Sequence, residues 1–471
     1  MTQRSGIFCR RALLFGWLQP AFVAGLLTLS PFSSSAQEFR LPPLPVDTFT
    51  LSNGLRVIVS EDHSAPVVAV NMWYYVGSAH EETGQSGLAH LFEHMMLQET
   101  ENLEDGELHS LVTRAGGICN GTTDFDRTEY FEILPSNRLN LALWLHAERM
   151  DRLVISEQSF ETQREVVKEE RRLRIENQPY AVSEHVLDSI GTDWEPYRHP
   201  TIGVMEDLDA ATTQDARSFY QRFYTPNNAV LAVAGDVTPA MVREMAERYL
   251  GPIPRGVDPH GLPPVPPTPR RDGERRAIVD DPLAQVPLLW VAYSIPPASD
   301  DDQYALSLLS TVFSAGESSR LHRRLVREER VAPMVASALS RRVGPGFFLF
   351  GALPNQGGSV ERIEALILEE VERLKGQGIT SEELETAKNQ HRASEVANRM
   401  TVQGKATGLQ WYQRHFGDPS RINSDFQGYE EVTVEDVLRV AREYLVDENR
   451  SVVLARPAAS KARAPEGGGV R

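Results

Sequence analysis

The stretch GLAHLFEHMML, residues 87–97, carries two histidines and a glutamate in a run that is otherwise apolar or small. Its hydrophobic spacing predicts a helix. Residues four positions apart share one face of a helix, so His90 and His94 are expected to point the same way. Two imidazoles at that spacing can bind one zinc ion. Glu93 lies between them, where it can act as a general base on water activated by the metal without being a ligand.

A catalytic zinc site needs a third protein ligand, which usually comes from elsewhere in the fold. Residues 156–176 have helical spacing and are rich in carboxylates. The candidate ligands there are Glu161, Glu165, Glu169, Glu170 and Glu176. Spacing alone does not choose among them, and most belong to a solvated face. The alternative for His90 and His94 is a place in the core, although burying two imidazoles and a carboxylate there is costly.

The chain has 471 residues, of which 41% are hydrophobic and 24% are charged. This composition is typical of soluble globular proteins, and the length indicates more than one domain. The formal net charge of −17 argues against a nucleic-acid partner, because a phosphate backbone binds to a basic surface. After residue 36, no run is long and apolar enough to span a bilayer.

Residues 1–36 are interpreted as a bacterial-type signal peptide. Arginines precede the apolar run ALLFGWLQPAFVAGLLTL, and small residues follow it up to a cleavage site after Ala36. We therefore expect a periplasmic or secreted protein. An uncleaved membrane anchor is the alternative, which the proline and glutamine inside the run disfavour. Cys9 lies in this segment, so the mature chain keeps only Cys119, which we expect to be a buried small side chain.

The proline-rich residues 253–273 are predicted to form a stiff linker without regular structure. They divide the chain into a metal-bearing half, residues 37–252, and a second half, residues 274–457. Residues 458–471 are predicted to be a disordered tail.

The two halves share a sequence pattern. DARSFYQRFYTPNNAVLAVAG from Asp215 and DVLRVAREYLVDENRSVVLA from Asp436 each indicate an amphipathic helix, a polar turn and an apolar strand, at an offset of 221 residues. VVAVNMWYYVGS from Val67 and VPLLWVAYSIPP from Val286 match at an offset of 219. Two matches at nearly one offset predict a duplicated domain. Each half is expected to be α+β, with a mostly antiparallel sheet and helices packed on one face.

GSAHEETGQSGLAHLFEHMML, residues 77–97, resembles the active-site region of the pitrilysin/insulinase zinc peptidases. The order His-x-x-Glu-His is that of the inverted zincins, the reverse of the commoner zinc-protease motif. AGGICNGTTDFDRTEYFEILP at 115–135, REVVKEERR at 164–172, HPTIG at 199–203 and FYTPNNAVLAVAGD at 223–236 also fit the family. The resemblance covers nearly the whole mature chain.

The resemblance implies the third metal ligand. Aligned on the family's distal helix, REVVKEER places this ligand at Glu170, with Glu169 as the fallback if the alignment slips by one residue. Gln163 stands where the family usually has a further glutamate beside the site. A glutamine there keeps the capacity for hydrogen bonding but brings no charge, so it can alter the orientation of the ligand.

The resemblance also implies contacts with substrate. Asn120 and Gly121, on a strand expected at 117–123, stand where the family adds a substrate peptide to a sheet edge. In the second half, Arg327 stands at the position of an arginine that holds substrate in the family. Met334 replaces the tyrosine that accompanies it, and methionine has no hydrogen bond to donate. The alternative for Arg327 is a solvated face, because other arginines crowd the same helix.

The repeat places no metal ligand opposite His90, so the second half is expected to be non-catalytic. The resemblance then implies the catalytic subunit of a heterodimer with a metal-free homologous subunit, with a homodimer as the alternative. The activity implied is that of an exported zinc-dependent endopeptidase, which cleaves peptides or unfolded segments inside a closed chamber with Glu93 as the base. The rival functions are a non-catalytic assembly subunit and a processing peptidase dedicated to one precursor peptide.

Overall fold

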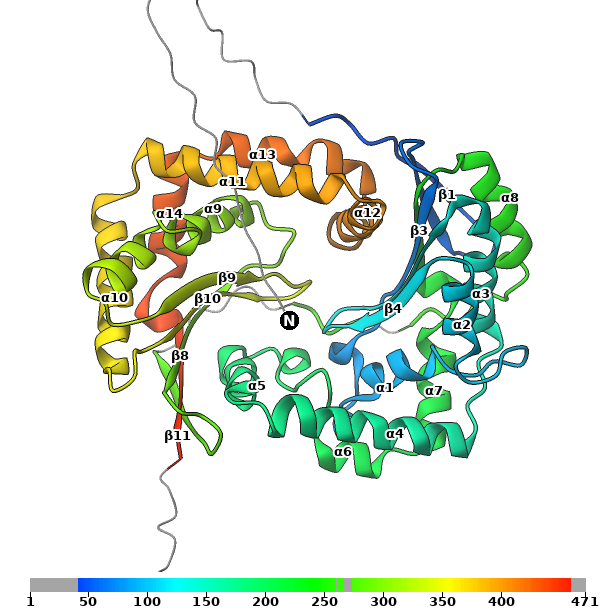
Figure 1. The fold of residues 1–471 in the computed structure, drawn as a ribbon, viewed down its shortest axis with the longest axis horizontal. Coiled ribbons are helices and arrows are strands. Elements are labelled where there is room, and N and C mark those ends of the chain that lie inside the picture. Colours follow the sequence, from blue (N-terminus) through cyan, green and yellow to red (C-terminus); the bar gives the residue numbers. More distant parts are fainter. Residues whose placement is uncertain (1–40, 260, 266–272, 459–471) are drawn as a thin grey trace, which may run out of the picture. The chain divides into compact units, whose positions relative to one another are not determined.

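The computed structural model describes residues 41–259, 261–265 and 273–458, and each half of the chain builds one β-sheet (Figure 1). The strands of the first sheet are β1 (Asp47–Thr50), β2 (Arg56–Glu61), β3 (Val67–Tyr74), β4 (Ile118–Thr123), β5 (Thr128–Pro135) and β6 (Ala229–Gly235). They lie in the order β1-β2-β6-β3-β5-β4. Only β2 and β6 are parallel, and the other neighbouring pairs are antiparallel.

The second sheet has the same plan with one strand fewer. Its strands are β7 (Arg275–Asp281), β8 (Leu288–Ile295), β9 (Met334–Ser340), β10 (Gly346–Leu353) and β11 (Arg450–Pro457), in the order β7-β11-β8-β10-β9. Here β7 and β11 form the parallel pair. The elements β6 and β11 begin 221 residues apart. The predicted α+β class, with a mostly antiparallel sheet in each of two related halves, is confirmed.

The first half contains eight of the described α-helices. They are α1 (Leu88–Met95), α2 (Glu107–Arg114), α3 (Leu139–Asp151), α4 (Glu157–Arg171), α5 (Ala181–Gly191), α6 (Met205–Ala210), α7 (Thr213–Phe223) and α8 (Pro239–Tyr249). A π-helical segment, η3 (Arg172–Glu176), continues α4. Short 3₁₀ turns are η1 (Ser78–His80), η2 (Ser136–Arg138), η4 (Glu195–Tyr197) and η5 (Pro226–Asn228).

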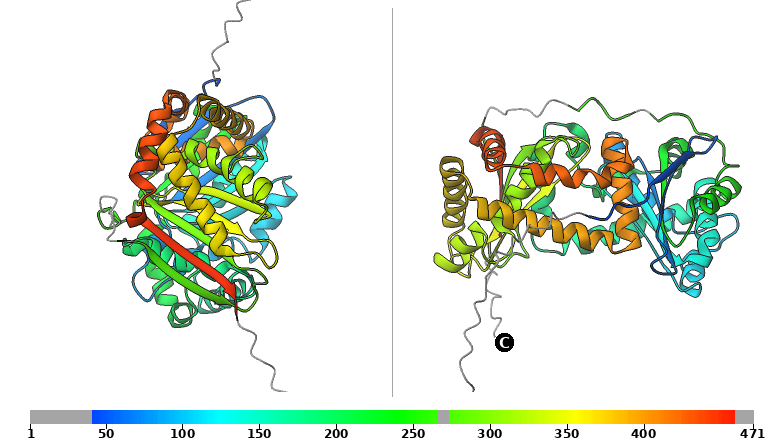
Figure 2. Two further views of the ribbon diagram at one scale, coloured as in Figure 1. Left: turned by 90° about the vertical axis from the view of Figure 1, so that its left-hand side faces the viewer. Right: turned by 90° about the horizontal axis from the view of Figure 1, so that it is seen from above.

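The described helices of the second half begin with α9 (Asp302–Ser314), the counterpart of α1 in the repeat. They continue with α10 (Val360–Gln377), α11 (Ser381–Arg399), α12 (Val402–Phe416), α13 (Asp425–Glu431) and α14 (Val434–Tyr444). A π-helical segment, η6 (His322–Glu328), and the 3₁₀ turns η7 (Pro419–Asn423) and η8 (Asp447–Asn449) complete the half. Figure 2 shows the same elements from two further directions.

Helices of the same half cover one face of each sheet. Val68, Val70 and Met72 of β3 share one buried core with Leu91 and Phe92 of α1. These strand residues alternate along the chain because successive side chains of a strand point to opposite faces. The strand β6, with the sequence AVLAVAG, is buried along its whole length since it lies between β2 and β3. The strand β4 lies at the free edge of the sheet, which leaves its outer backbone groups unpaired by the sheet.

The opposite face of each sheet is covered by a helix from the other half. Ala406 and Leu409 of α12 share a buried cluster with Ala69 of β3. Reciprocally, Leu187 of α5 shares one with Phe347 of β10. The helices α5 and α12 begin 221 residues apart, like β6 and β11, so the two halves exchange equivalent elements of the repeat. The sequence patterns did not predict this exchange.

Polar contacts also join α12 to the first half. The buried amide nitrogen of Gln410 donates to the carbonyl oxygens of Asn71, at 2.8 Å, and Val230, at 2.7 Å. Lys405 forms an ion pair with Asp62. The first sheet therefore reaches its full burial only when the second half is folded beside it.

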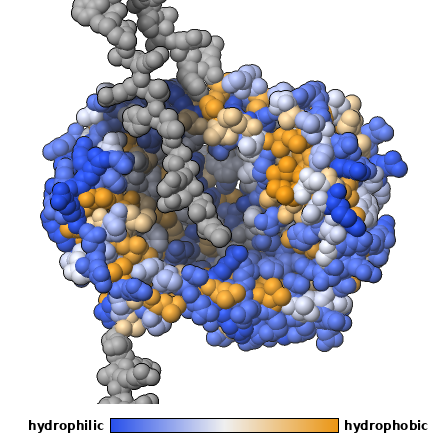
Figure 3. Space-filling view, viewed as in Figure 1, coloured by the Kyte–Doolittle hydropathy of each residue, from blue (hydrophilic) through white to orange (hydrophobic). Residues whose placement is uncertain are grey.

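The described part of the linker, residues 253–259 and 261–265, contains no helix or strand. The interpreted signal peptide and residues 459–471 of the tail lie outside the described residues. Within the described residues, no helix has the length and apolar character that crossing a bilayer requires. The face drawn in Figure 3 is mostly hydrophilic with smaller hydrophobic patches.

Candidate metal centre

The helix α1 carries both histidines of the motif and packs against β4, β5 and α4. His90 is buried, and His94 is half-buried one helical turn later. The centroids of their rings lie 5.0 Å apart. The predicted helix over this stretch is therefore present, and it places both imidazoles on one side.

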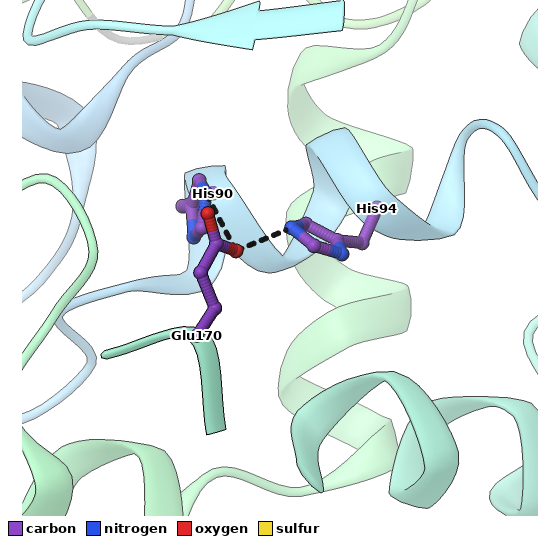
Figure 4. Close-up of side chains that lie close together, drawn as sticks. All are labelled: His90, His94 and Glu170. Atoms are coloured by element: carbon purple, nitrogen blue, oxygen red, sulfur yellow. Dashed lines mark ion pairs between the residues drawn. The ribbon is translucent and has the colours of Figure 1, made fainter. Parts of the chain in front are cut away.

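Glu170, in the last turn of α4, faces the two imidazoles (Figure 4). Its Oε2 atom lies 3.0 Å from Nε2 of His94 and 3.7 Å from Nε2 of His90. One ligand atom from each of the three residues lies within 4.8 Å of the other two. The other carboxylate oxygen, Oε1, forms an ion pair with Nε of Arg174 at 2.9 Å. One oxygen of the Glu170 carboxylate therefore faces the two histidines, and the other is paired with Arg174.

Glu169 points elsewhere, although it precedes Glu170 in the chain. Its carboxylate pairs with Arg172 at 3.1 Å, and its side chain is 58% exposed. Neighbouring residues on an α-helix are separated by about 100° around the axis. The geometry thus favours Glu170 over the fallback Glu169 as the carboxylate of the cluster.

The protonation states of His90 and Glu170 suit a metal. Burial, together with the neighbouring His94, lowers the pKa of His90 to about 4, so its imidazole is neutral at pH 7. A hydrogen bond from His94 lowers the pKa of Glu170, which keeps its carboxylate ionised. Metal coordination requires a neutral imidazole and a deprotonated carboxylate.

The donor set fits zinc in kind and in spacing. Two imidazole nitrogens and one carboxylate oxygen are typical zinc ligands, and three protein ligands leave a fourth position open in catalytic sites. Two ligands of a tetrahedral zinc ion lie about 3.3 Å apart, given bond lengths of about 2.0–2.1 Å. The 3.0 Å and 3.7 Å separations between Glu170 and the histidines lie on either side of that value.

Glu93 lies on α1 beside the cluster and is hydrogen-bonded to the edge strand β4. The hydroxyl of Thr123, on β4, donates to Oε2 of Glu93 at 2.6 Å. Burial raises the pKa of Glu93 above its ordinary value, because a charged carboxylate is costly away from water. A carboxyl group with a raised pKa is a better proton acceptor near neutral pH than an ordinary glutamate. No spacing pattern in the sequence predicts this contact of Thr123.

The strand β4 brings the two predicted substrate residues next to Glu93. A Cβ atom on Gly121 would lie 3.0 Å from Cγ of Glu93 and 3.3 Å from the ring of Tyr130, so a side chain at this position would require its neighbours to shift by a few tenths of an ångström. The Asn120 side chain is exposed, and its Oδ1 accepts from the amide N–H of Gly121 at 2.9 Å.

The neighbouring Cys119 is partly buried, with Sγ 3.0 Å from Nδ1 of His109. Burial raises the pKa of its thiol to about 11. Cys119 therefore remains a thiol at neutral pH. It is only partly buried, whereas the sequence predicted a buried small side chain.

The remaining predicted residues lie in different surroundings. Gln163 is buried on α4, two turns before Glu170 and on the same side of the helix. Arg327 lies on η6, where its half-exposed guanidinium pairs with Glu317. Among the described residues, Arg327 forms no ion pair with the cluster of His90, His94 and Glu170. Met334 begins β9 and is 57% exposed.

Comparison with known proteins identifies the family of this chain. Residues 56–203 match the family model described as Insulinase (Peptidase family M16), and residues 210–391 match that of the Peptidase M16 inactive domain. The chain is 33% identical over 427 residues to the zinc protease PqqE of Helicobacter pylori. This alignment covers 87% of this chain and 93% of that protein. The chain belongs to the insulinase family of peptidases, M16. The resemblance indicated by the sequence motifs is thus confirmed.

Other M16 proteins match along most of the chain. An uncharacterised zinc protease of Mycobacterium leprae is 29% identical over 419 residues, covering 88% of this chain and 93% of that protein. The crystal structure of a protease from Helicobacter pylori has a TM-score of 0.83 at 31% identity, over 88% of this chain and all of that chain. The periplasmic protease PqqL from Escherichia coli shares the fold, with a TM-score of 0.73 at 19% identity over 90% of this chain and 50% of that chain.

Proposed function

We propose that this M16 protein is an exported zinc-dependent endopeptidase, with zinc held by His90, His94 and Glu170. The observation that carries the proposal is the convergence of one ligand atom from each of these residues to within 4.8 Å. Relatives that are named zinc proteases support the choice of metal. Zinc bound by such ligands polarises a carbonyl group and lowers the pKa of water.

Glu93 is the proton carrier of the proposed reaction. Its carboxylate accepts a proton from the water molecule as the water oxygen bonds to the peptide carbonyl carbon. It then returns a proton to the amine nitrogen as the carbon–nitrogen bond breaks. The hydrogen bond from Thr123 holds one carboxylate oxygen of Glu93, which leaves the other oxygen for the proton.

The edge of β4 is the proposed binding place for the substrate. Its outer backbone groups are not paired within the sheet, and Gly121 lies against Glu93. A peptide that adds to this edge as a further strand binds through main-chain hydrogen bonds with little dependence on its sequence. Asn120 and Gly121 then lie beside the peptide bond to be cleaved. The substrate class is a peptide or unfolded segment small enough for a closed chamber.

Export and a partner subunit complete the proposal. Residues 1–36 carry the sequence features of a signal peptide, and a fold relative is named a periplasmic protease. That relative is about twice as long as the matched segment, which suggests two such units in one assembly. Met334 stands where a tyrosine would donate to substrate. We infer a metal-free homologous subunit that supplies the missing group, with a homodimer as the alternative.

Metal analysis of purified mature protein tests the proposed ligands. Wild type should contain one zinc ion per chain, and His94→Ala should contain almost none. His63→Ala is the matched control, because His63 also contacts two carboxylates, Glu61 at 2.7 Å and Asp236 at 2.6 Å, but is 54% exposed. Retention of zinc by His94→Ala, or its loss from His63→Ala, would count against the proposed ligand set.

A further inference from the structure

Glu81 lies beside the start of α1, and its side chain is completely buried. Oε2 accepts a hydrogen bond from the amide N–H of Gly87 at 2.9 Å, and Oε1 accepts one from Ala89 at 2.7 Å. The first N–H groups of a helix have no acceptor within the helix itself. One carboxylate therefore satisfies two N–H groups at the start of the helix that carries both histidines.

The helix α1 has no side-chain cap of its own. Its N-cap residue is Gly87, with φ of 95°, and no cap hydrogen bond comes from that position. A carboxylate at a helix N-terminus is also favoured by the positive end of the helix dipole. Ala89, which donates to Glu81, immediately precedes His90. The position of His90 therefore depends on the hydrogen bond that the preceding residue, Ala89, donates to Glu81.

A second set of contacts fixes the same point. Oδ2 of Asp207 accepts from the amide N–H and the hydroxyl of Ser86, at 3.0 Å and 2.6 Å, and the amide N–H of Val204 donates to the Ser86 hydroxyl at 3.0 Å. A Cβ atom on Gly87 would lie 2.8 Å from the carbonyl oxygen of Ile202. The start of α1 is thus packed against Ile202 on one side and hydrogen-bonded to Glu81 on the other.

The groups that face Glu81 give its carboxylate no other strong partner. Among the described residues, no lysine or arginine forms an ion pair with it. Nδ1 of His199 lies 3.6 Å from Oε2, but burial lowers the pKa of His199 and favours its neutral form. Burial, together with the nearby Asp207, raises the pKa of Glu81 well above its ordinary value, although the two N–H groups of α1 act in the opposite direction. The contacts with α1 are therefore the main interactions of this side chain.

We propose that Glu81 is a positioning residue of the zinc site, which fixes the first turn of α1 and thereby the place of His90 without touching the metal. This inference rests on the proposed function, because it assigns a role towards zinc held by His90, His94 and Glu170. Residues that orient metal ligands typically change metal affinity by about 10–100-fold when they are replaced.

The test is the zinc affinity of the purified mature chain, measured by competition with a chromogenic chelator. In Glu81→Gln, an amide NH₂ replaces one acceptor oxygen, so either Gly87 or Ala89 loses its acceptor. We expect zinc affinity to fall about ten-fold or more. The absorption spectrum of the cobalt-substituted variant should also shift, since the ligand geometry changes.

Asp436→Asn is the matched control. Asp436 also accepts a backbone N–H at a helix start, from Thr433 at 2.9 Å, but it belongs to α14 in the second half. The zinc affinity of Asp436→Asn should stay within two-fold of wild type. Equal weakening in Glu81→Gln and Asp436→Asn would show a general effect of helix capping and would overturn the positioning role.

The remaining outcomes separate this inference from the proposed function. If wild type binds zinc and Glu81→Gln binds it within two-fold, the positioning role is wrong and the zinc site stands. If wild type binds no zinc, the proposed function fails and this inference fails with it. If Glu81→Gln does not fold, Glu81→Asp takes its place, because the shorter acid keeps the carboxyl group but cannot reach both N–H groups. Unchanged zinc affinity in Glu81→Asp would then overturn the inference.

Discussion

The hydroxyl of Thr123 donates to Oε2 of Glu93 across 2.6 Å, which joins the edge strand β4 to the helix of the two histidines. The proposed base and the proposed substrate strand are thus held in one fixed relation. A base must lie within hydrogen-bond reach of the proton that it takes, so this contact bears directly on the rate.

Thr123→Val is expected to lower kcat about ten-fold while zinc content stays the same, because Glu93 loses a fixed orientation but no metal ligand changes. Cleavage of a quenched fluorescent peptide, together with metal analysis, measures both quantities. Thr311→Val, which removes a hydroxyl bonded to Ser307 in the second half, should leave kcat unchanged. Equal rates for wild type and Thr123→Val would show that the contact has no part in catalysis.

Gly121→Ala is expected to lower kcat at least ten-fold, because its methyl group would press on Cγ of Glu93 at 3.0 Å and on the ring of Tyr130 at 3.3 Å. Peptide cleavage again gives the readout. Gly376→Ala makes the same substitution in α10, where a Cβ atom meets nothing within 4 Å. That control should keep full activity and gain about 0.5–1 kcal/mol of stability. Full activity in Gly121→Ala would show that β4 or Glu93 can move to make room for the added methyl group without loss of catalysis.

Breaking the buried ion pair of Glu132 and Arg149 should destabilise the first half. Burial alone would raise the pKa of Glu132, but Arg149 and His146 together lower it to about 2, so the carboxylate is charged. Glu132→Gln leaves Arg149 buried without a countercharge, which should cost about 3 kcal/mol or more of unfolding free energy. Urea unfolding measures this change. Glu101→Gln, at a 67% exposed position, should change the unfolding free energy by less than about 0.5 kcal/mol.

The stability contributed by Asp62 should depend on pH. The hydrogen bond from Lys405 lowers the pKa of Asp62 from 3.8 to about 2. A depressed folded-state pKa stabilises the protein above the unfolded pKa, and the contribution is lost as pH falls towards the folded pKa. Wild type should therefore exceed Asp62→Asn in unfolding free energy at pH 7, and the difference should shrink between about pH 4 and pH 2. A difference independent of pH would refute the assigned partner.

The sequence predicted that His90 and His94 lie together because their spacing follows the helical repeat. His90 and His94 are four positions apart, so one helix is enough to place them together. The choice of Glu170 needed the family resemblance, since Glu169 satisfies the same local pattern. The structure separates the two by direction, with Glu170 facing the histidines and Glu169 paired with Arg172.

The exchange of α5 and α12 was beyond such reasoning. An amphipathic pattern shows that a helix buries one face but not which sheet receives it. Leu187 of α5 is buried with Phe347, far away in the sequence. Likewise, Glu81 and Thr123 lie in stretches that resemble the family, yet their roles follow from bonds to α1 that no spacing rule reveals.

The most direct test of the account compares wild type with Glu93→Gln in zinc content and in cleavage of a quenched peptide library, with and without a homologous metal-free subunit. Both proteins should contain one zinc ion per chain, because Glu93 is not a ligand. Cleavage should fall at least about 10²-fold in Glu93→Gln. Cleavage by Glu93→Gln at the wild-type rate would contradict the account. So would a wild-type protein that contains zinc but cleaves no peptide when the homologous subunit is present.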